Sequence, residues 1–324
     1  MASFFEKLSN AYTNNVSPGK PKFLPEHYPD LTGKTVVVTG ANAGVGFQST
    51  KLLLAAGAQV VVVIRNLDKM KAAEEQLKVD LKAPKLEVFQ ADFSDLTSIG
   101  PCAQKIVQKY PKIHIVLHNA GVMVPPKGSV TKQNYELQLG TNTLAPYLLQ
   151  KYLDGAVLAA STNDFISRVI WVSSNAYLQG PSPRGLLPYD DINDKKGRYG
   201  GFAIYGQSKA GMNYNALIYA EKHKGIIITA ALNPGGLKSD LQRHLSSIQR
   251  SLLGLLLADP VYGAYTELYA ALSPDITVEK SGCFVRPWGQ IEEYSNFIKE
   301  GVKDGTAKRF NEWTEEQVAP YYEK

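Results

Sequence analysis

Tyr205 and Lys209 stand four residues apart and are the two side chains in this sequence best placed for acid–base chemistry. Residues at positions i and i+4 share one face of a helix, so we expect the Lys209 ammonium beside the Tyr205 phenol, where it would stabilise the phenolate. A phenol has a pKa of about 10, and lowering it by roughly three units requires about 4 kcal/mol of differential stabilisation. One ammonium together with an oxidised nicotinamide can supply that amount. The pair therefore predicts a tyrosine that acts as a general acid and base.

A glycine-rich segment at residues 39–46 precedes this pair. It follows an apolar stretch, residues 35–38, that is typical of a buried strand, and it leads into a helical stretch that reaches residue 56. Glycines let the backbone turn sharply and let a pyrophosphate approach the helix N-terminus, whose free N–H groups and dipole attract anions. The spacing differs from the common GxGxxG motif, and a tight turn without a ligand is the alternative. With a strand before it and a helix after it, the segment predicts dinucleotide contacts from Gly40, Asn42, Gly44, Val45 and Gly46.

Short apolar strands alternate with helical segments along most of the chain. The predicted strands are residues 35–38, 59–64, 86–90, 113–117, 168–173 and 226–232. The predicted helices, besides the one that follows the glycines, are residues 67–81, 97–109, 137–158 and 205–222. This alternation predicts an α/β fold of the Rossmann type, a doubly wound parallel sheet with helices on both faces.

We expect a single domain with additions at both ends. Residues 1–31 would form an N-terminal strap, residues 32–287 the dinucleotide-binding domain, and residues 288–324 a C-terminal extension. Residues 175–204 and 238–259 interrupt the alternation, and loops of this length are commonly lids or binding loops. The second loop contains the apolar run 252–257, which could be a substrate lid, a buried helix core or a membrane contact, and is too short to span a bilayer.

Composition disfavours several classes of function. The 324 residues are 44% hydrophobic and 20% charged, as in ordinary globular proteins, and the net charge of +5 is spread without a Lys/Arg block, which disfavours nucleic-acid binding. Cys102 and Cys283 fit no disulfide or metal motif, and the five histidines are scattered, so no metal site is expected. No signal peptide or membrane-spanning segment is recognisable, and a reducing cytoplasmic location fits best.

Arg65 follows the second predicted strand, at the position that normally faces the adenosine ribose. A carboxylate there would bind both ribose hydroxyls and repel a 2′-phosphate, whereas a guanidinium can pair with that phosphate. Arg65 therefore favours NADPH over NADH, and an exposed arginine that merely closes a strand is the alternative. Asp92 and Phe93 follow the third strand and could hold the adenine amino group and ring, through the carboxylate and a backbone N–H; a plain turn is the other interpretation.

The ordered series of motifs resembles the short-chain dehydrogenase/reductase family over roughly residues 32–287. The matching residues are 39–46, Asp92, His118-Asn119-Ala120-Gly121, Asn142, Ser173-Ser174, Tyr205-x-x-x-Lys209 and Asn233-Pro234-Gly235. The segment that ends at Lys209 looks most like the retinol-dehydrogenase-like branch, which includes many fungal carbonyl reductases. Two departures stand out. His118, expected to be a packed core histidine, replaces an asparagine, and Leu237-Lys238-Ser239 stands where a threonine often touches the nicotinamide carboxamide.

The resemblance implies a role for each of these residues. Ser174, with Ser173 as the alternative, would polarise the substrate carbonyl while Tyr205 donates the proton. Lys209 would hold the nicotinamide ribose, and Asn142 would kink its helix and hold a water that passes protons to Lys209. Tyr205 and Lys209 are themselves among the NADP(H) contacts that the family implies, and the remaining ones are Asn119, Ala120, Gly121, Pro234, Gly235, Leu237 and Ser239.

These features together predict reversible, NADPH-dependent reduction of a hydrophobic ketone or aldehyde to an alcohol. The apolar run 252–257, with Tyr177, Leu178 and Trp288 nearby in the family's topology, makes a strongly charged substrate unexpected. One alternative is a catalytically silent NADPH-sensing or scaffold protein, and another is a sugar-nucleotide epimerase that retains NAD⁺. Binding the dinucleotide alone requires neither Ser174 nor a perturbed phenol, which argues against the silent alternative. Both a monomer and a homodimer are compatible with the sequence.

Overall fold

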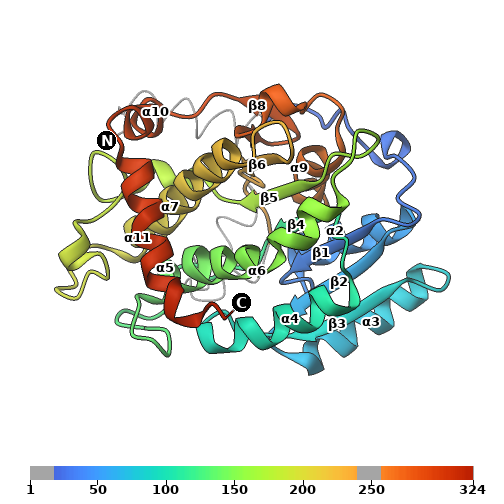
Figure 1. Cartoon of the computed structure of the whole chain (residues 1–324), viewed down its shortest axis with the longest axis horizontal. Helices are drawn as coiled ribbons and strands as arrows, with labels where there is room; N and C mark the ends of the chain where they lie inside the picture. Colours follow the sequence, from blue (N-terminus) through green and yellow to red (C-terminus); the bar gives the residue numbers. More distant parts are fainter. Residues whose placement is uncertain (1–17, 239–256, 324) are drawn as a thin grey trace.

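Valine-rich strands form the central sheet of the molecule (Figure 1). The computed structural model describes residues 18–238 and 257–323, and in it eight strands pair in the order β3-β2-β1-β4-β5-β6-β7-β8. They are β1 (Thr35–Thr39), β2 (Gln59–Ile64), β3 (Leu86–Gln90), β4 (Ile115–His118), β5 (Arg168–Val172), β6 (Ile228–Leu232), β7 (Cys283–Arg286) and β8 (Gln290–Glu292). Strands β1 to β7 run parallel, and β8 pairs antiparallel with β7. Strand β1 is buried along its whole length because helices cover both faces, which is why valines can fill it.

Helices pack on both faces of this sheet (Figure 1). On one face lie α2 (Gly44–Ala55), α3 (Leu67–Asp80) and α9 (Pro260–Leu272). On the other lie α4 (Ile99–Lys109), α6 (Ala145–Ala160) and α7 (Gly201–Lys222), with α10 (Asn296–Lys303) and α11 (Thr306–Val318) outside α7. Shorter turns are α5 (Leu137–Leu139), the π-helical η4 (Gly140–Leu144), and η2 (Pro25–His27), η3 (Leu96–Ser98), η5 (Asn175–Gln179), η6 (Tyr189–Asp191), η8 (Val278–Lys280) and η9 (Ala319–Tyr321). The predicted doubly wound α/β fold is confirmed.

Parallel strands bring the candidate site residues to one edge of the sheet. Thr39, the last residue of β1, is in register with Val63 of β2, and Val38 is in register with Leu117 of β4. The loops that leave the carboxyl ends of neighbouring strands therefore lie side by side, and this edge is where open α/β sheets bind ligands. These loops begin at Gly40, Arg65, Ala91, Asn119, Ser173 and Asn233.

The end of the chain continues the sheet beyond the predicted strands. Strand β7 extends the sheet from β6 and turns into β8 through Gly289, whose φ of +79° favours glycine. The domain boundary expected at residue 287 thus falls inside a hairpin of the same sheet. Helix α11 then packs on α7, where a Cβ at Gly211 would lie 2.5 Å from the Phe310 ring. Helix α7 itself begins at Gly201, four residues before the predicted start.

The described part of the strap, residues 18–31, packs against the body. Leu31 is fully buried, and the Phe23 ring meets Tyr269 of α9 edge-on at 5.9 Å between centroids. The Gln290 side chain of β8 donates a hydrogen bond of 2.8 Å to the Pro18 carbonyl. Residues 1–17 lie outside the described part of the chain, and so do residues 239–256, which hold most of the apolar run 252–257.

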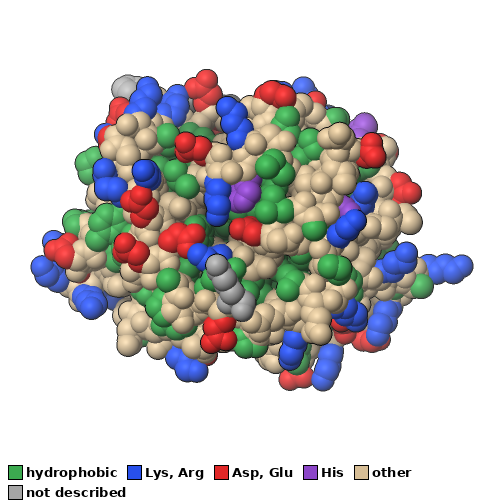
Figure 2. Space-filling model, in the orientation of Figure 1, with side chains coloured by type: hydrophobic (Ala, Val, Ile, Leu, Met, Phe, Trp, Pro, Cys, Tyr) green, Lys and Arg blue, Asp and Glu red, His purple; other side chains and the backbone are tan. Residues whose placement is uncertain are grey.

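The face of the molecule in Figure 2 mixes acidic and basic side chains, in keeping with the dispersed charge of the sequence. In residues 18–238 and 257–323 we find no helix long and apolar enough to cross a membrane. The same residues contain no group of three or more His, Cys, Asp or Glu side chains that could hold a metal ion. Cys102 and Cys283 are both free thiols.

His118 is a packed core residue, as the sequence predicts. Its ring has no exposed surface and stacks on Trp171 of β5 at 4.4 Å between centroids. Its Nε2 lies 2.9 Å from Oε1 of Gln150, whose amide nitrogen in turn donates to Asp154 and Tyr219. Since both amide protons of Gln150 are used, its oxygen accepts, and His118 must carry its proton on Nε2. Burial lowers the pKa of His118 to about 4.

This shift predicts that His118 makes the fold sensitive to acid. The folded-state pKa of His118 is about 4, against an ordinary value of 6.5. The contribution of the neutral His118 ring to the free energy of unfolding is therefore fully present above pH 6.5 and is lost as pH falls toward 4. The total loss is on the order of 3 kcal/mol. In His118→Phe, which keeps an aromatic ring on Trp171, the loss of stability between pH 7 and pH 4 should be smaller by about that amount. Denaturant titrations of both proteins across this range measure it. Parallel curves for variant and wild type would contradict the assignment.

Candidate active site

The backbone of the glycine turn between β1 and α2 is closely approached by neighbouring groups and has little room for side chains. Gly40 and Gly44 have φ of +73° and +58°, which disfavour any side chain. A Cβ at Gly46 would lie 2.3 Å from the amide nitrogen of Asn119 and 2.4 Å from the Gly40 carbonyl oxygen. Ala43, at the start of α2, provides no side-chain cap, so the N–H groups of the first helical turn remain available to an anion. The turn therefore has room for a pyrophosphate, and the dinucleotide contacts of Asn42, Val45 and the glycines around them stay a prediction.

The end of β4 is tied to the same turn. The Asn119 amide donates to the carbonyl oxygens of Thr39 at 2.8 Å and Gly40 at 3.1 Å. The Ala120 N–H donates to the Thr39 hydroxyl at 2.9 Å. These bonds fix the loop of Asn119, Ala120 and Gly121 against the glycine turn, where the family pattern places the floor of the cofactor site.

Arg65 is the exposed first residue after β2. Its carbonyl accepts a hydrogen bond of 2.9 Å from the Gln90 side chain, and the next residue, Asn66, caps α3. Within the described residues its guanidinium makes no hydrogen bond or ion pair. The side chain is therefore available to a phosphate at the edge of the glycine turn.

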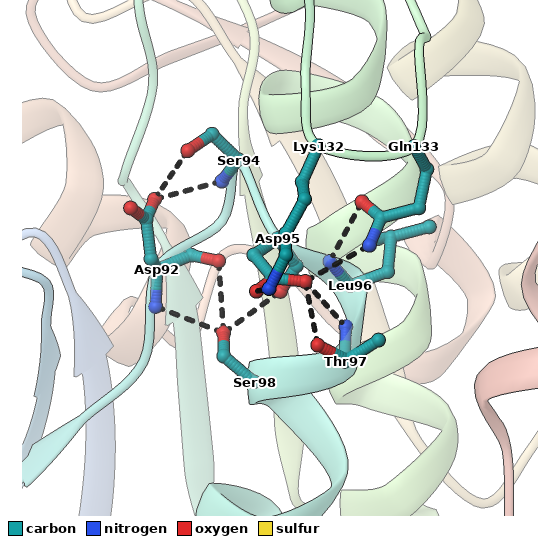
Figure 3. A network of polar contacts seen from close by, with 8 residues as sticks. All are labelled: Asp92, Ser94, Asp95, Leu96, Thr97, Ser98, Lys132 and Gln133. Carbon is teal, nitrogen blue, oxygen red and sulfur yellow. Dashed lines mark hydrogen bonds and ion pairs between the residues drawn. The ribbon is translucent and has the colours of Figure 1, made fainter.

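Asp92 forms a turn that leaves one carboxylate oxygen available (Figure 3). Its Oδ1 accepts from the N–H of Ser94 at 2.9 Å and from the Ser94 hydroxyl at 2.7 Å. Its own N–H donates to the Ser98 hydroxyl at 3.0 Å. The turn interpretation of Asp92 is thus correct, and within the described residues the second oxygen has no partner that would exclude the predicted adenine contact. Phe93, the other predicted adenine contact, is buried.

Asp95, which the sequence analysis missed, holds this turn in place (Figure 3). Burial alone would raise its pKa, but hydrogen bonds from Lys132, Thr97 and Gln133 outweigh burial and hold the pKa well below its ordinary value. The 2.8 Å contact with Lys132 joins the loop after β3 to the segment that leads into α5. The Asp95-Leu96-Thr97 sequence at the start of η3 is a local capping pattern and was the available signal.

Ser174, Tyr205 and Lys209 come together at the carboxyl end of β5. The Ser174 side chain lies near enough to the Tyr205 hydroxyl to oppose the rise in its pKa, and the Lys209 ammonium lies 5.6 Å from the centre of the Tyr205 ring. Lys209 donates a 2.7 Å bond to the Val172 carbonyl. Ser173 instead turns its hydroxyl to the Lys209 carbonyl at 3.2 Å. The geometry therefore favours Ser174 over Ser173 as the serine that faces the phenol.

The proton affinities of this pair differ from the sequence-based expectation. Burial raises the pKa of Tyr205 to about 12, although the nearby Ser174 side chain opposes the shift. Burial also lowers the pKa of Lys209 to about 7. Exclusion of water penalises both charged forms, and this desolvation is the largest cause of both shifts. In the chain alone Tyr205 is therefore a protonated donor at neutral pH.

Asn142 lies in the π-helical turn η4 between α5 and α6, which is the local distortion that the family pattern implies. The Asn142 side-chain amide is fully buried and makes two hydrogen bonds to the backbone of Val122. It accepts from the Val122 N–H at 2.8 Å and donates to the Val122 carbonyl at 2.9 Å. A Cβ at Gly121 would lie 3.1 Å from Asn142 Oδ1 and 3.8 Å from the Lys209 ammonium. Asn142 and Lys209 thus flank the same glycine, close enough for a water to join them.

The loop after β6 lies at the same edge of the sheet. Gly235 has φ of +100°, and a Cβ there would lie 2.6 Å from the Trp288 ring, so this loop packs tightly on the hairpin. Leu237, two residues on, is buried, whereas Ser239 falls outside the described residues. Trp288 and Leu178 are buried too, and Tyr177 packs in the core against Phe284 and Phe297. Their part in holding a substrate stays a prediction.

Asn175, the residue after Ser174, is a further polar group that the sequence analysis missed. Both polar atoms of its side-chain amide are shielded from solvent and have no hydrogen-bond partner among the described residues. An unpaired buried amide costs about 1–3 kcal/mol, so a water or a ligand is expected to satisfy it. No pattern in the sequence signals such a group, because it follows from packing.

Comparison with known proteins identifies the family. A family profile described as short chain dehydrogenase matches residues 34–184. A short-chain dehydrogenase/reductase of Phomopsis amygdali is 35% identical over 337 aligned residues, which cover 99% of this chain and 100% of that protein. The chain belongs to the short-chain dehydrogenase/reductase family. It is an oxidoreductase of that family, and the resemblance predicted from the sequence is confirmed.

Solved structures of other proteins share the fold. An uncharacterized protein from Mycobacterium Paratuberculosis superimposes with a TM-score of 0.69 at 24% identity, covering 91% of this chain and 97% of that one. A short chain dehydrogenase from Shigella flexneri, complexed with NADP, has a TM-score of 0.60 at 22% identity and covers 79% of this chain and 97% of that one. At such identities the likeness supports the fold of this short-chain dehydrogenase/reductase and nothing finer.

Proposed function

We propose that this short-chain dehydrogenase/reductase reduces a hydrophobic ketone or aldehyde to an alcohol with NADPH, in a reversible reaction. The observation that carries the proposal is the grouping of Ser174, Tyr205 and Lys209 at the sheet edge where the glycine turn lies, with the Lys209 ammonium 5.6 Å from the centre of the phenol ring. A protein that only binds a dinucleotide has no use for a buried phenol aimed at a serine hydroxyl.

The chain's own residues supply the proton and the orientation. Ser174 donates a hydrogen bond to the substrate carbonyl oxygen and polarises it, and Tyr205 transfers its phenolic proton to that oxygen as negative charge develops. A Tyr205 pKa of about 12 suits this role because the phenol is protonated at neutral pH. NADPH, when bound, supplies the hydride that the carbonyl carbon receives. Lys209 and Asn142 would hold the ribose and a water that returns a proton to the phenolate.

NADP(H) is the dinucleotide that the phosphate side of the site favours. The uncapped first turn of α2 and the close approach at Gly46 fit a pyrophosphate, and the free guanidinium of Arg65 fits the 2′-phosphate. Two solved structures with a similar fold, short chain dehydrogenases from Shigella flexneri and Escherichia coli, are complexed with NADP and NADPH. No carboxylate stands at position 65 to bind the free 2′-hydroxyl of NADH.

Arg65→Ala should therefore raise the Kd for NADPH by roughly 10- to 100-fold, because a charged hydrogen bond contributes about 1.5–3 kcal/mol. Affinity for NADH should change little. Fluorescence titration of both dinucleotides measures the two constants. Lys78→Ala, which removes a cation from the far end of α3, serves as the control for net charge. Equal losses for NADPH and NADH in Arg65→Ala would contradict the phosphate role.

The reaction is tested by following NADPH absorbance with a panel of aromatic and aliphatic ketones and aldehydes, with NADH in parallel. We expect turnover with NADPH and with the apolar members of the panel. Measurable NADPH binding without turnover of any member would argue for the silent, cofactor-sensing alternative. Retention of NAD⁺ through purification would argue for the epimerase alternative.

A further inference from the structure

Val124 adopts a backbone conformation that valine rarely tolerates. Its φ is +46°, in the left-handed region. A β-branched side chain is a genuine outlier there, because the branch crowds the backbone. Such conformations persist only where the surroundings impose them, and they cluster at ligand sites. Val124 lies in the loop after β4, three residues beyond Gly121 of the cofactor floor.

Gln138 of α5 holds Val124 in this conformation. Its Oε1 accepts the Val124 N–H at 2.8 Å, and the side chain is 1% exposed. Its amide nitrogen is 3.3 Å from two acceptors, the Gly201 carbonyl and a carboxylate oxygen of Glu136. The amide therefore faces partners on both its oxygen and its nitrogen side, and it joins the Val124 loop to the first residue of α7.

The Val124 side chain packs against the first turn of α7, four residues before Tyr205. A Cβ at Gly201 would lie 2.8 Å from Val124 Cγ1, so the valine occupies the space that a side chain at position 201 would take. Gly201 and Tyr205 are four residues apart on one helix and share a face. Helical side chains lean toward the N-terminus, so the Tyr205 ring lies over the turn that Val124 contacts.

We propose that Val124, held by Gln138, is a specificity-determining residue whose side chain forms the wall beside Tyr205 and limits the size of one substituent on the substrate carbonyl. This inference rests on the proposed carbonyl reduction and names the feature of the substrate that the site selects. A substrate substituent no larger than methyl fits against the isopropyl side chain of Val124, whereas a branched substituent collides with that side chain. Gln138 is a positioning residue, because it acts on the substrate only through Val124.

The test compares an aryl isopropyl ketone with the matched aryl methyl ketone, both with NADPH. In Val124→Gly the ratio of kcat/KM for the isopropyl ketone over the methyl ketone should rise at least about tenfold, since a pocket that gains the space of one to three carbons discriminates by that order. The Tm of Val124→Gly should fall only by the amount expected from losing the packing contacts of a half-buried valine. The backbone conformation itself should not lower the Tm, because glycine adopts the left-handed conformation without strain. Gln138→Leu, which keeps the valine but removes its hydrogen bond, should shift the ratio in the same direction.

Ala83→Gly is the matched control, because Ala83 also has a positive φ, of +51°, in the exposed turn between α3 and β3. In Ala83→Gly the ratio of kcat/KM for the isopropyl ketone over the methyl ketone should equal that of the wild type. A change of less than twofold in folded Val124→Gly would overturn the inference and leave the reductase proposal standing. Absence of turnover of either ketone by the wild type, despite NADPH binding, would overturn both.

Discussion

Replacing Tyr205 by phenylalanine should lower kcat for carbonyl reduction by about 10²- to 10⁴-fold, the usual contribution of a positioned general acid. The ring remains to fill its buried space, and only the hydroxyl that meets Ser174 is lost. The Kd for NADPH should stay within about twofold of the wild type, because the glycine turn and Arg65 are untouched. Stopped-flow measurement of NADPH oxidation gives the first quantity, and fluorescence titration gives the second.

Tyr214→Phe is the matched control for this change. Tyr214 lies further along α7, is also buried, and donates its hydroxyl to the Arg184 carbonyl at 2.9 Å, away from the Ser174 cluster. Loss of the Tyr214 hydroxyl should lower the free energy of unfolding by about 1 kcal/mol and leave kcat unchanged. Equal kcat in Tyr205→Phe and the wild type would remove the tyrosine from the proton transfer. It would favour a mechanism in which water reaches the carbonyl directly.

The fold was predictable where hydrophobic period and turn chemistry agree. The valine runs of β1 and β2 are too apolar for a half-exposed strand, and the glycines after β1 mark a turn, so the strands and the site edge follow from the sequence. The hairpin of β7 and β8 was not predicted. Its strands are four and three residues long, and their place in the sheet depends on pairing with β6, which is a tertiary contact.

The candidate site was predictable from motif order but its energetics were not. Spacing places Tyr205 and Lys209 on one helix face, and the structure brings Ser174 to them. The direction of their pKa shifts depends on how completely the helices exclude water, which spacing cannot report. The strained Val124 and its partner Gln138 are likewise invisible in the sequence, because both are common residues whose roles arise from a φ angle and one hydrogen bond.

A buried carboxylic acid between α2 and α9 is the second feature from which a large effect follows. Glu267 of α9 has no exposed surface, and its Oε2 accepts a 2.6 Å hydrogen bond from Ser49 of α2. Its Oε1 is shielded and has no partner among the described residues. Burial raises the pKa of Glu267 to about 8, and the hydrogen bond from Ser49 offsets only part of that shift. The side chain is therefore largely protonated in the folded protein at neutral pH.

The sign of its contribution to stability follows from this shift. Because the folded-state pKa of about 8 lies above the ordinary 4.5, the contribution of Glu267 is fully present below pH 4.5 and is lost as pH rises through 8. At pH 7 the contribution of Glu267 to the free energy of unfolding is already lower than at pH 4 by an amount on the order of 3 kcal/mol. Glu267→Gln has nearly the same shape, keeps an acceptor for Ser49 and carries no charge at any pH. We therefore expect the variant to be more stable than the wild type at pH 8, by about 1–3 kcal/mol after the unpaired amide is counted.

Denaturant titrations at pH 5, 7 and 9 measure this difference, and the gap between Glu267→Gln and the wild type should widen with pH. Glu316→Gln, at an exposed position of α11, removes the same charge without burial and should follow the wild type at every pH. A Glu267→Gln variant less stable than the wild type at pH 9 would mean that the folded protein solvates the carboxylate. In that case Oε1 must gain a partner on ionisation, either a water molecule or a group brought to it by a shift of α9 relative to α2. The same titrations in the presence of NADPH would then reveal whether that shift reaches the glycine turn, since Ser49 and Gly46 lie within one turn of α2.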